Sequence, residues 1–201
     1  MKIAIIKYNA GNVQSVLYAL QRLGIAATVT DDHTEIKNAD KVIFPGVGNA
    51  GSAMAYLRKN GLDKVITSLQ QPVLGICLGL QLMCDHSEEE DTTCLGIFNV
   101  PVKKFVKKEG GNISSFKIPH MGWNTIYNLS SPLFEGISEN SFVYNVHSYY
   151  ASLSPQTIAT TNYIIPYSSA INKDNFYGVQ FHTEKSALAG AHILSNFLKI
   201  V

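Results

Sequence analysis

The 201-residue chain has few cysteines and no long apolar run, and each shortage excludes a class of protein. Its three cysteines, Cys77, Cys84 and Cys94, include no C-x-x-C pair, and an odd count is a poor basis for a disulfide framework. We therefore expect free thiols in the reducing environment of the cytoplasm. The apolar part of the opening MKIAIIKYNAGN is too short for a signal peptide, and no stretch approaches the roughly 20 apolar residues that a membrane span needs.

Charge is also scarce. Charged residues make up 15% of the chain and the formal net charge is +1, which argues against binding to nucleic acid through bulk electrostatics. The histidines form no H-E-x-x-H motif and show no paired spacing typical of metal ligands, so we expect neither a metal ion nor a cofactor. A hydrophobic content of 46% indicates a globular protein, and the length suits one domain over residues 1–201.

Strands and helices alternate in the first half of the sequence. Apolar runs predict strands at Lys2–Ile6, Ala26–Thr30, Lys41–Phe44 and Val73–Ile76. Helical spacing of apolar residues predicts helices that begin at Val13, Ala50, Leu62 and Leu78. This succession is typical of a parallel sheet with helices on both faces.

The second half has a different rhythm. It predicts strands around Val100–Lys107, Asn124–Tyr127, Phe142–Val146, Thr157–Tyr163, Ser169–Asn172 and Phe176–Phe181. A loop is expected over residues 112–119, and a last helix begins near Ser186 with Leu188, Ala191, Leu194, Leu198 and Val201 on one face. We predict an α/β fold of three layers, α/β/α, with a mostly parallel central sheet and extra antiparallel strands in the second half.

A cysteine stands between two glycines at the point where a buried strand passes into a helix. Gly75-Ile76-Cys77-Leu78-Gly79 has the form G-x-C-x-G, the thiol version of the nucleophile elbow, in which small neighbours let the backbone make a strained turn. The following helix points its N-terminus at the sulfur and favours the thiolate, and the N–H of Leu78 is placed to bind an oxyanion. The alternative is a packed cysteine in a glycine-rich turn.

A thiolate nucleophile needs a base and a group that orients the base. His182 and Glu184 follow an apolar strand just before the last helix. Because alternate residues of an extended segment point the same way, we expect the carboxylate to hold the imidazole in the form that accepts the thiol proton. Parallel strands that end at the same sheet edge bring this pair to Cys77.

A second glycine-rich turn, G-V-G-N-A-G at residues 46–51, matches the G-x-G-x-x-G pattern of dinucleotide-binding proteins. Such a site also needs an acidic residue about 20 positions on, at the end of the next strand. That strand ends in Cys77 instead. A sharp turn that exposes backbone N–H groups is therefore the better interpretation.

The combination of G-I-C-L-G-L-Q at Cys77 with Q-F-H-T-E-K-S at His182 and Glu184 resembles the class I, or triad, glutamine amidotransferases. The stretches P-G-V-G at 45–48, K-I-P-H-M-G-W-N at 117–124 and H-S-Y at 147–149 resemble, within that family, the glutaminase subunits of imidazole glycerol phosphate synthase. The resemblance runs from end to end of the chain. Thr183 departs from it, because the family usually has proline between the histidine and the glutamate.

The resemblance implies a role for each site residue. Cys77 attacks the side-chain amide of glutamine, His182 protonates the leaving ammonia, and Glu184 completes the triad. Backbone N–H groups of Val47 and Leu78 form the oxyanion hole, and the P-G-V-G segment reorients on activation. The residues implied in binding glutamine are Gly46, Gly48, Gln81, Glu89, His147, Ser148 and Tyr149.

The same resemblance implies a partner. Free ammonia gains a proton in water and stops being a nucleophile, so a glutaminase benefits from a sealed path to a synthase. In the family this partner is a cyclase subunit of (β/α)8 fold, and Pro119, His120, Met121 and Trp123 are the expected interface. We expect no nucleic acid and no membrane as partners.

Three alternatives stay open at this stage. The same glutaminase chemistry fits a different acceptor synthase, such as a sugar amidotransferase, because nothing in the chain recognises the acceptor. A cysteine peptidase or thiol hydrolase of the same fold would use the same triad. A non-catalytic interaction module would not need Cys77, His182 and Glu184 together.

Overall fold

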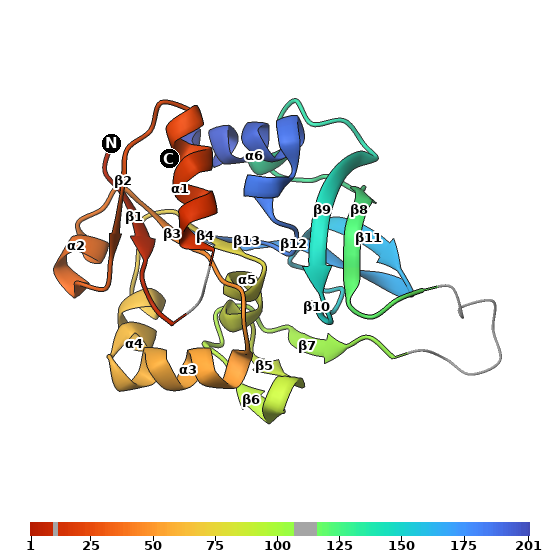
Figure 1. Cartoon of the computed structure of the whole chain (residues 1–201), viewed down its shortest axis with the longest axis horizontal. Coiled ribbons are helices and arrows are strands. Elements are labelled where there is room, and N and C mark those ends of the chain that lie inside the picture. Colours follow the sequence, from red (N-terminus) through yellow and green to blue (C-terminus); the bar gives the residue numbers. More distant parts are fainter. Residues whose placement is uncertain (10–11, 107–115) are drawn as a thin grey trace.

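The computed structural model describes residues 1–9, 12–106 and 116–201, and its centre is a seven-stranded sheet. The strand order is β11-β12-β13-β4-β3-β1-β2 (Figure 1). The strands are β1 (Ile3–Ile6), β2 (Ala27–Thr30), β3 (Lys41–Phe44), β4 (Val73–Ile76), β11 (Thr157–Tyr163), β12 (Ile165–Lys173) and β13 (Phe176–Val179). The five from β2 to β13 are mutually parallel, whereas β12 and β11 run antiparallel at one edge.

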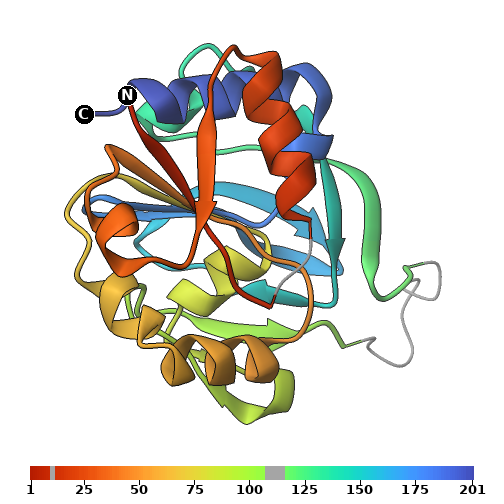
Figure 2. The ribbon, with the colours of Figure 1, turned by 60° about the vertical axis from the view of Figure 1, so that its left-hand side comes forward.

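Helices cover both faces of this sheet (Figure 2). On one face lie α1 (Val13–Arg22) and α6 (Ala187–Lys199), which share a buried apolar cluster with the sheet. The other face carries α2 (His33–Lys37), α3 (Ala50–Lys59), α4 (Leu62–Thr67) and α5 (Leu78–Met83) around a second apolar cluster. The predicted α/β/α fold, with a mostly parallel sheet, is confirmed.

The remaining strands form two small sheets beside the main one. One contains β10 (Tyr149–Ala151), β7 (Pro101–Lys104), β5 (His86–Ser87) and β6 (Thr92–Thr93). The other is the antiparallel pair of β8 (His120–Ile126) and β9 (Ser141–His147), joined in register from His120 opposite His147 to Ile126 opposite Ser141. β7, β8, β9 and β10 are among the extra strands expected in the second half, whereas β5 and β6 come earlier in the chain and β5 pairs parallel with β7.

Several local expectations need correction. The short helix α2, capped by the side chain of Asp32, was not expected, because five residues show too little periodicity. The predicted apolar face of the last helix is only partly right: Leu194 is buried as expected, but Leu188 is 87% exposed, and Ile193 and Phe197 are buried as well. This helix has apolar residues on more than one side, so only its packing selects the inner face. Of the loop expected over residues 112–119, residues 112–115 lie outside the described part of the chain.

Candidate active site

Cys77 stands at the sharp turn between β4 and α5. Its backbone has φ 53° and ψ −108°, a conformation that is strained for a residue with a side chain. The flanking glycines are required by space: a Cβ at Gly79 would collide with the carbonyl of Phe44, and one at Gly75 would collide with the backbone of α5. The sequence thus places the sulfur at the tip of an elbow, as the G-x-C-x-G pattern predicted.

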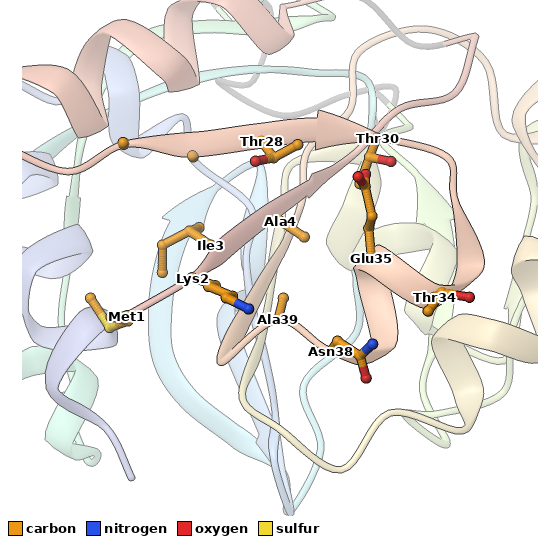
Figure 3. A pocket seen from close by; sticks show the side chains of 12 residues that line it. Met1, Lys2, Ile3, Ala4, Thr28, Thr30, Thr34, Glu35, Asn38 and Ala39 are labelled. Carbon is orange, nitrogen blue, oxygen red and sulfur yellow. The ribbon is translucent and has the colours of Figure 1, made fainter.

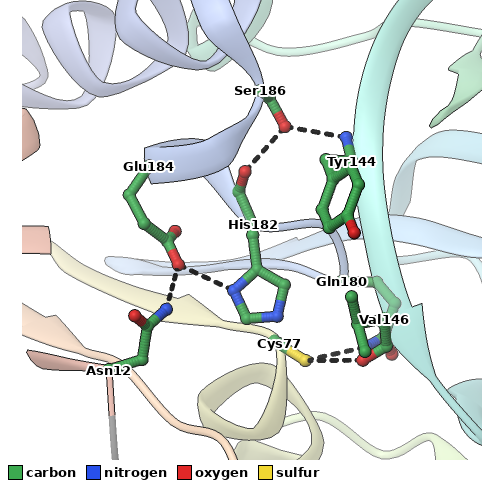
Figure 4. Close-up of polar contacts among 8 residues, drawn as sticks. All are labelled: Asn12, Cys77, Tyr144, Val146, Gln180, His182, Glu184 and Ser186. Atoms are coloured by element: carbon green, nitrogen blue, oxygen red, sulfur yellow. Dashed lines mark hydrogen bonds and ion pairs between the residues drawn. The ribbon is translucent and has the colours of Figure 1, made fainter. Parts of the chain in front are cut away.

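His182 and Glu184 meet as a pair, although the backbone between them is not extended. The Nδ1 of His182 lies 2.7 Å from Oε1 of Glu184, and the Nδ2 of Asn12 donates to the same oxygen at 2.5 Å (Figure 4). Residues Thr183–Lys185 form the 3-10 turn η4. The extended geometry expected here is therefore wrong, because the turn folds back and brings the carboxylate beside the ring.

The charge of His182 is controlled by its neighbours. Burial alone would lower the pKa of this imidazole, but hydrogen bonding to Cys77 and to Glu184 outweighs burial and raises the pKa to about 10. The hydroxyl of Ser186 donates to the carbonyl of His182 at 2.6 Å and holds the turn in place. The ring stands between a sulfur and a carboxylate (Figure 4), which is the arrangement for moving a proton to and from Cys77.

The register of the sheet explains why these residues meet. Strands β4 and β13 are parallel neighbours, and Ile76 pairs with Val179. Cys77 and His182 therefore follow the carboxyl ends of adjacent strands, where open α/β sheets carry their sites. A cavity of about 350 Å³ opens at this edge, and both residues line it together with segments of β9 and β10.

The expected oxyanion hole is not open. The N–H of Leu78 donates to the carbonyl of Gly46 at 3.2 Å, so the Gly46–Val47 peptide presents its oxygen, and not its N–H, to the end of α5. Val47 and Leu78 both line the cavity. Gly48 has φ 131°, a conformation that only glycine adopts easily, and a Cβ there would meet open space. The peptide before Val47 must turn over before both N–H groups face the cavity.

Comparison with known proteins decides the family. A family model for glutamine amidotransferase class-I matches residues 4–201. The chain belongs to the class I glutamine amidotransferase family.

Similar proteins narrow this assignment. The imidazole glycerol phosphate synthase subunit HisH of Bacteroides thetaiotaomicron is 55% identical over 200 residues and that of Bacteroides fragilis is 56% identical, with 100% of this chain and of each relative covered. The HisH subunit of Yersinia pseudotuberculosis is 44% identical over 202 residues, again with both chains fully covered. These relatives bear out the glutaminase expectation over a peptidase or a sugar amidotransferase.

Solved structures bear out the fold. A glutamine amidotransferase superposes with a TM-score of 0.72 at 14% identity, covering 98% of this chain and 97% of that one. A chain of the PurLQS structure from Thermotoga maritima gives a TM-score of 0.68 at 12% identity with the same coverage. At these identities the likeness concerns the fold alone.

Most of the residues expected to bind glutamine line the cavity of this amidotransferase: Gly48, Gln81, Glu89, His147, Ser148 and Tyr149. Glu89 accepts a hydrogen bond from the N–H of Ala50 at 2.8 Å. Burial raises the pKa of its carboxyl, and the Ala50 contact opposes that rise. Gly46, the remaining residue of that set, is not among those that line the cavity: its carbonyl accepts from the N–H of Leu78, and a Cβ there would collide with the hydroxyl of Tyr8.

His147 needs a correction, because its ring nitrogens are directed at protein groups. Nδ1 lies 2.8 Å from the carbonyl of Tyr149, which can only accept, and Nε2 lies 3.3 Å from the hydroxyl of Tyr167. Burial, with His120 nearby, lowers the pKa of His147 to about 3, so the ring is neutral. His147 borders the cavity and holds the backbone of Tyr149; it does not offer a free nitrogen to a substrate.

The expected partner interface divides into exposed and buried residues. Met121 is 64% exposed and Trp123 is 52% exposed, on one face of the β8–β9 pair, and Pro119 is exposed at the cavity rim. His120 is buried and stacks on the ring of Tyr163, with centroids 3.8 Å apart. His120, expected in the interface together with these residues, points instead to the buried face of β8, because alternate residues of a strand point to opposite faces.

Sequence reasoning missed four residues that border the sulfur or the triad. They are Asn12 on Glu184, Lys185 in the cavity wall, and Gln180 and Val146, which lie 3.7 Å and 3.8 Å from the Cys77 sulfur. Lys185 and Gln180 lie within two residues of the triad in the sequence, and this proximity could have identified them. Asn12 and Val146 come from distant segments and carry no pattern of their own.

A larger cavity, of about 500 Å³, lies away from the triad, against β1, β2 and α2 (Figure 3). Its lining contains Lys2, Glu35 and three threonines but no nucleophile beside a base, so we do not assign the chemistry there. Among the described residues, no group of three or more His, Cys, Asp or Glu side chains could hold a metal ion. In the same part of the chain, no helix is both long and apolar enough to cross a membrane.

Proposed function

We propose that this amidotransferase is the glutaminase subunit of an imidazole glycerol phosphate synthase, serving histidine biosynthesis, with Cys77, His182 and Glu184 as its triad. The observation that carries the proposal is the meeting of Cys77 and the His182–Glu184 pair at one sheet edge in a chain that matches HisH subunits over its full length. All three cysteines are free, which supports a reaction in the cytoplasm. We treat residues 1–201 as one glutaminase domain.

The reaction uses the triad in two halves. The Cys77 thiolate attacks the side-chain amide carbon of glutamine, forming a C–S bond and placing negative charge on the amide oxygen. The C–N bond then breaks as protonated His182 gives its proton to the leaving nitrogen, which departs as ammonia. In the second half His182 removes a proton from water, the hydroxide attacks the thioester, and glutamate leaves as the thiolate re-forms.

The oxyanion requires two donors. Leu78 supplies one N–H from the start of α5, and Val47 supplies the other once its peptide has turned over. The Gly46 carbonyl accepts from Leu78 in the present structure, which supports a resting state with low activity. Gly48, free to adopt many backbone conformations, supplies the hinge.

Glutamine is a zwitterion at its α-carbon, so its site needs an anion and several donors. We assign Glu89 to the α-amino group, because it is the carboxylate in the cavity wall. Ser148 and Tyr149, which follow β9, line the same cavity and are assigned to the α-carboxylate. Gln81 contributes its side-chain oxygen, since its amide nitrogen already donates to Tyr149 and Gln180.

The ammonia passes to a cyclase subunit of (β/α)8 fold, which makes imidazole glycerol phosphate and aminoimidazole carboxamide ribotide. We place the docking face on β8 and β9, where Met121, Trp123 and Phe142 are each more than half exposed. Trp123 packs edge-on against Tyr144 across the pair, so this apolar face is continuous. Exposed aromatic residues beside a cavity are typical anchors of an interface.

The test is a glutaminase assay of the complex with the cyclase subunit, with glutamate and the cyclised product both measured. Cys77→Ser should abolish glutamate release while leaving the fold intact, because serine keeps the volume but loses the nucleophile. Cys84→Ser is the matched control: Cys84 is fully buried in α5's packing and burial raises its pKa, so activity should be retained. Full activity in Cys77→Ser, or peptide cleavage in place of glutamate release, would reject the proposal.

A further inference from the structure

Gln180 lies directly on the nucleophile and has no role in the mechanism so far. It follows β13, its backbone N–H donates to the carbonyl of Ser169 at 2.8 Å, and its side chain is fully buried. The Nε2 atom lies 3.7 Å from the sulfur of Cys77, within hydrogen-bonding range for sulfur (Figure 4). A buried amide with its donor on a sulfur is a specific arrangement, because a buried donor is costly when it has no partner.

The orientation of this amide is fixed by a second glutamine. Gln81 donates through Nε2 to the carbonyl of Tyr149 at 2.8 Å, and a backbone carbonyl can only accept. The same Nε2 lies 3.0 Å from Oε1 of Gln180. A reversed Gln180 amide would set two donors against each other, so the geometry requires Oε1 on Gln81 and Nε2 on the sulfur.

We propose that Gln180 is the hydrogen-bond donor that stabilises the Cys77 thiolate and fixes the position of its sulfur, and that Gln81 is the positioning residue that aims it. The inference rests on the proposed function for its catalytic meaning but not for its geometry. A hydrogen bond to the charged form of an acid favours ionisation, and a donor beside the sulfur also restricts its rotation. Gln180 thereby raises the share of enzyme that is ready to attack.

The other groups around the sulfur show why the contact from Gln180 matters for the charge of Cys77. The carbonyl of Val146, 3.8 Å away, accepts from the neutral thiol and opposes the thiolate. The titratable groups whose charges interact with that of Cys77 include the imidazole of His182 and the hydroxyls of Tyr8 and Tyr167. Burial raises the pKa of both tyrosines, so they stay neutral across the working range. His182 and Gln180 are then side chains that favour the thiolate, in addition to the N-terminus of α5.

The test measures the rate at which iodoacetamide alkylates Cys77 in the full chain as a function of pH. Mass spectrometry of the peptides follows each cysteine separately. Gln180→Met keeps the side-chain length and removes the donor, so the midpoint of the alkylation profile should move to higher pH by about one unit. In the complex at pH 7, kcat should fall about tenfold with KM changed much less, which corresponds to that same one-unit shift. Gln156→Met is the matched control, because Gln156 lies outside the site and Oε1 has no hydrogen-bond partner among the described residues.

Gln81→Met provides a second, independent variant. It leaves Gln180 in place but removes the contact that orients its amide, so a smaller shift in the same direction is expected. A folded Gln180→Met with the wild-type alkylation profile overturns the proposal; if that variant does not fold, an unshifted profile in Gln81→Met does so. The alkylation assay uses no glutamine, so it tests this inference separately from the proposed function. If the profiles shift but the complex releases no glutamate, the proposed function is rejected and this inference is retained.

Discussion

The two sides of the catalytic cavity are in different states. On the sulfur side, Cys77, His182 and Glu184 each have their partners in place, and Gln180 lies against the nucleophile. On the oxyanion side, the N–H of Leu78 is occupied by the carbonyl of Gly46. In the mechanism we propose, the groups needed for attack are therefore assembled in the isolated chain, whereas stabilisation of the transition state requires one peptide to turn over.

The difference follows from what each side is built on. The sulfur side consists of residues at the ends of β4 and β13, which are fixed by the sheet and by two buried clusters. The oxyanion side is a loop whose two glycines flank Val47. Turning over the Gly46–Val47 peptide changes ψ of Gly46 and φ of Val47, and the absence of a Cβ at Gly46 lowers the cost of that rotation.

The largest effect on the glutaminase rate should come from binding of the cyclase subunit, which we expect to open the oxyanion side. The isolated chain should hydrolyse glutamine slowly, and the cyclase subunit with its acceptor substrate should raise the rate about 10²–10³-fold, the usual worth of one oxyanion donor. Steady-state glutamate release with and without the partner measures this ratio. Full activity of the isolated chain would contradict the gating.

Acid should destabilise the fold through His147, which borders the cavity. His147 is buried with its pKa lowered to about 3, below its usual 6.5, so the unfolded chain binds a proton before the folded one does. Stability is therefore complete above pH 6.5 and decreases as the pH falls towards 3, with a loss of about 2 kcal/mol at pH 5 from this residue alone.

Urea unfolding at pH 8 and pH 5 measures this dependence. His147→Gln, which cannot titrate, should remove most of the difference between the two conditions. An equal loss of stability between pH 8 and pH 5 in the wild type and the variant would show that His147 is not the group responsible.

A substitution in the docking face should have a smaller effect on the partner's activation of glutaminase. Trp123→Ala should lower the partner's activation of glutaminase about tenfold, because a truncated interface anchor typically costs over 1 kcal/mol. Tyr18→Ala is the control: Tyr18 is 53% exposed on α1, close to the 52% of Trp123, but lies outside the β8–β9 face. An unaltered response in Trp123→Ala would remove this residue from the interface.

The smallest effect is expected at Thr183. This residue opens η4, and the preceding His182 has ψ 101°, the extended value that a following proline requires. Its hydroxyl is buried and, within the described part of the chain, makes no hydrogen bond. Thr183→Pro should therefore change the glutaminase rate less than about threefold and raise stability by about 0.4–1 kcal/mol. Thermal unfolding and kcat test this, and a collapse in activity would mean that the Thr183 backbone N–H is needed.

Local patterns predicted the elements that are short, apolar and bounded by glycine or proline. The expected strands at Lys41–Phe44, Val73–Ile76 and Thr157–Tyr163 agree with β3, β4 and β11 residue for residue. The elbow at Cys77 was equally clear, because a nucleophile at a strand-to-helix turn needs glycines at fixed spacing. The other strands of the second half were found, but with ends that differ by up to four residues from those of β8, β9, β12 and β13.

Errors arose where a side chain's surroundings come from distant segments. His120 was expected on the surface, but Tyr163 and Tyr167 bury it on the inner face of β8. His182 and Glu184 were expected on an extended segment, but Glu184 lies in a 3-10 turn that contacts α1 and β9, and Asn12 donates to its carboxylate. Composition and spacing carry no information about either neighbour.

The sequence by itself determined the elbow at Cys77 and most of the order of strands and helices, because these depend on residue types at short spacing. Only the tertiary structure decided that Gly46 occupies the Leu78 N–H and that Gln180, aimed by Gln81, lies against the sulfur. Those contacts join residues 32 to 103 positions apart, and one 3.2 Å hydrogen bond sets whether the oxyanion side is open. The direction of a peptide or of an amide is set by its partners in space, and no local pattern of residues encodes it.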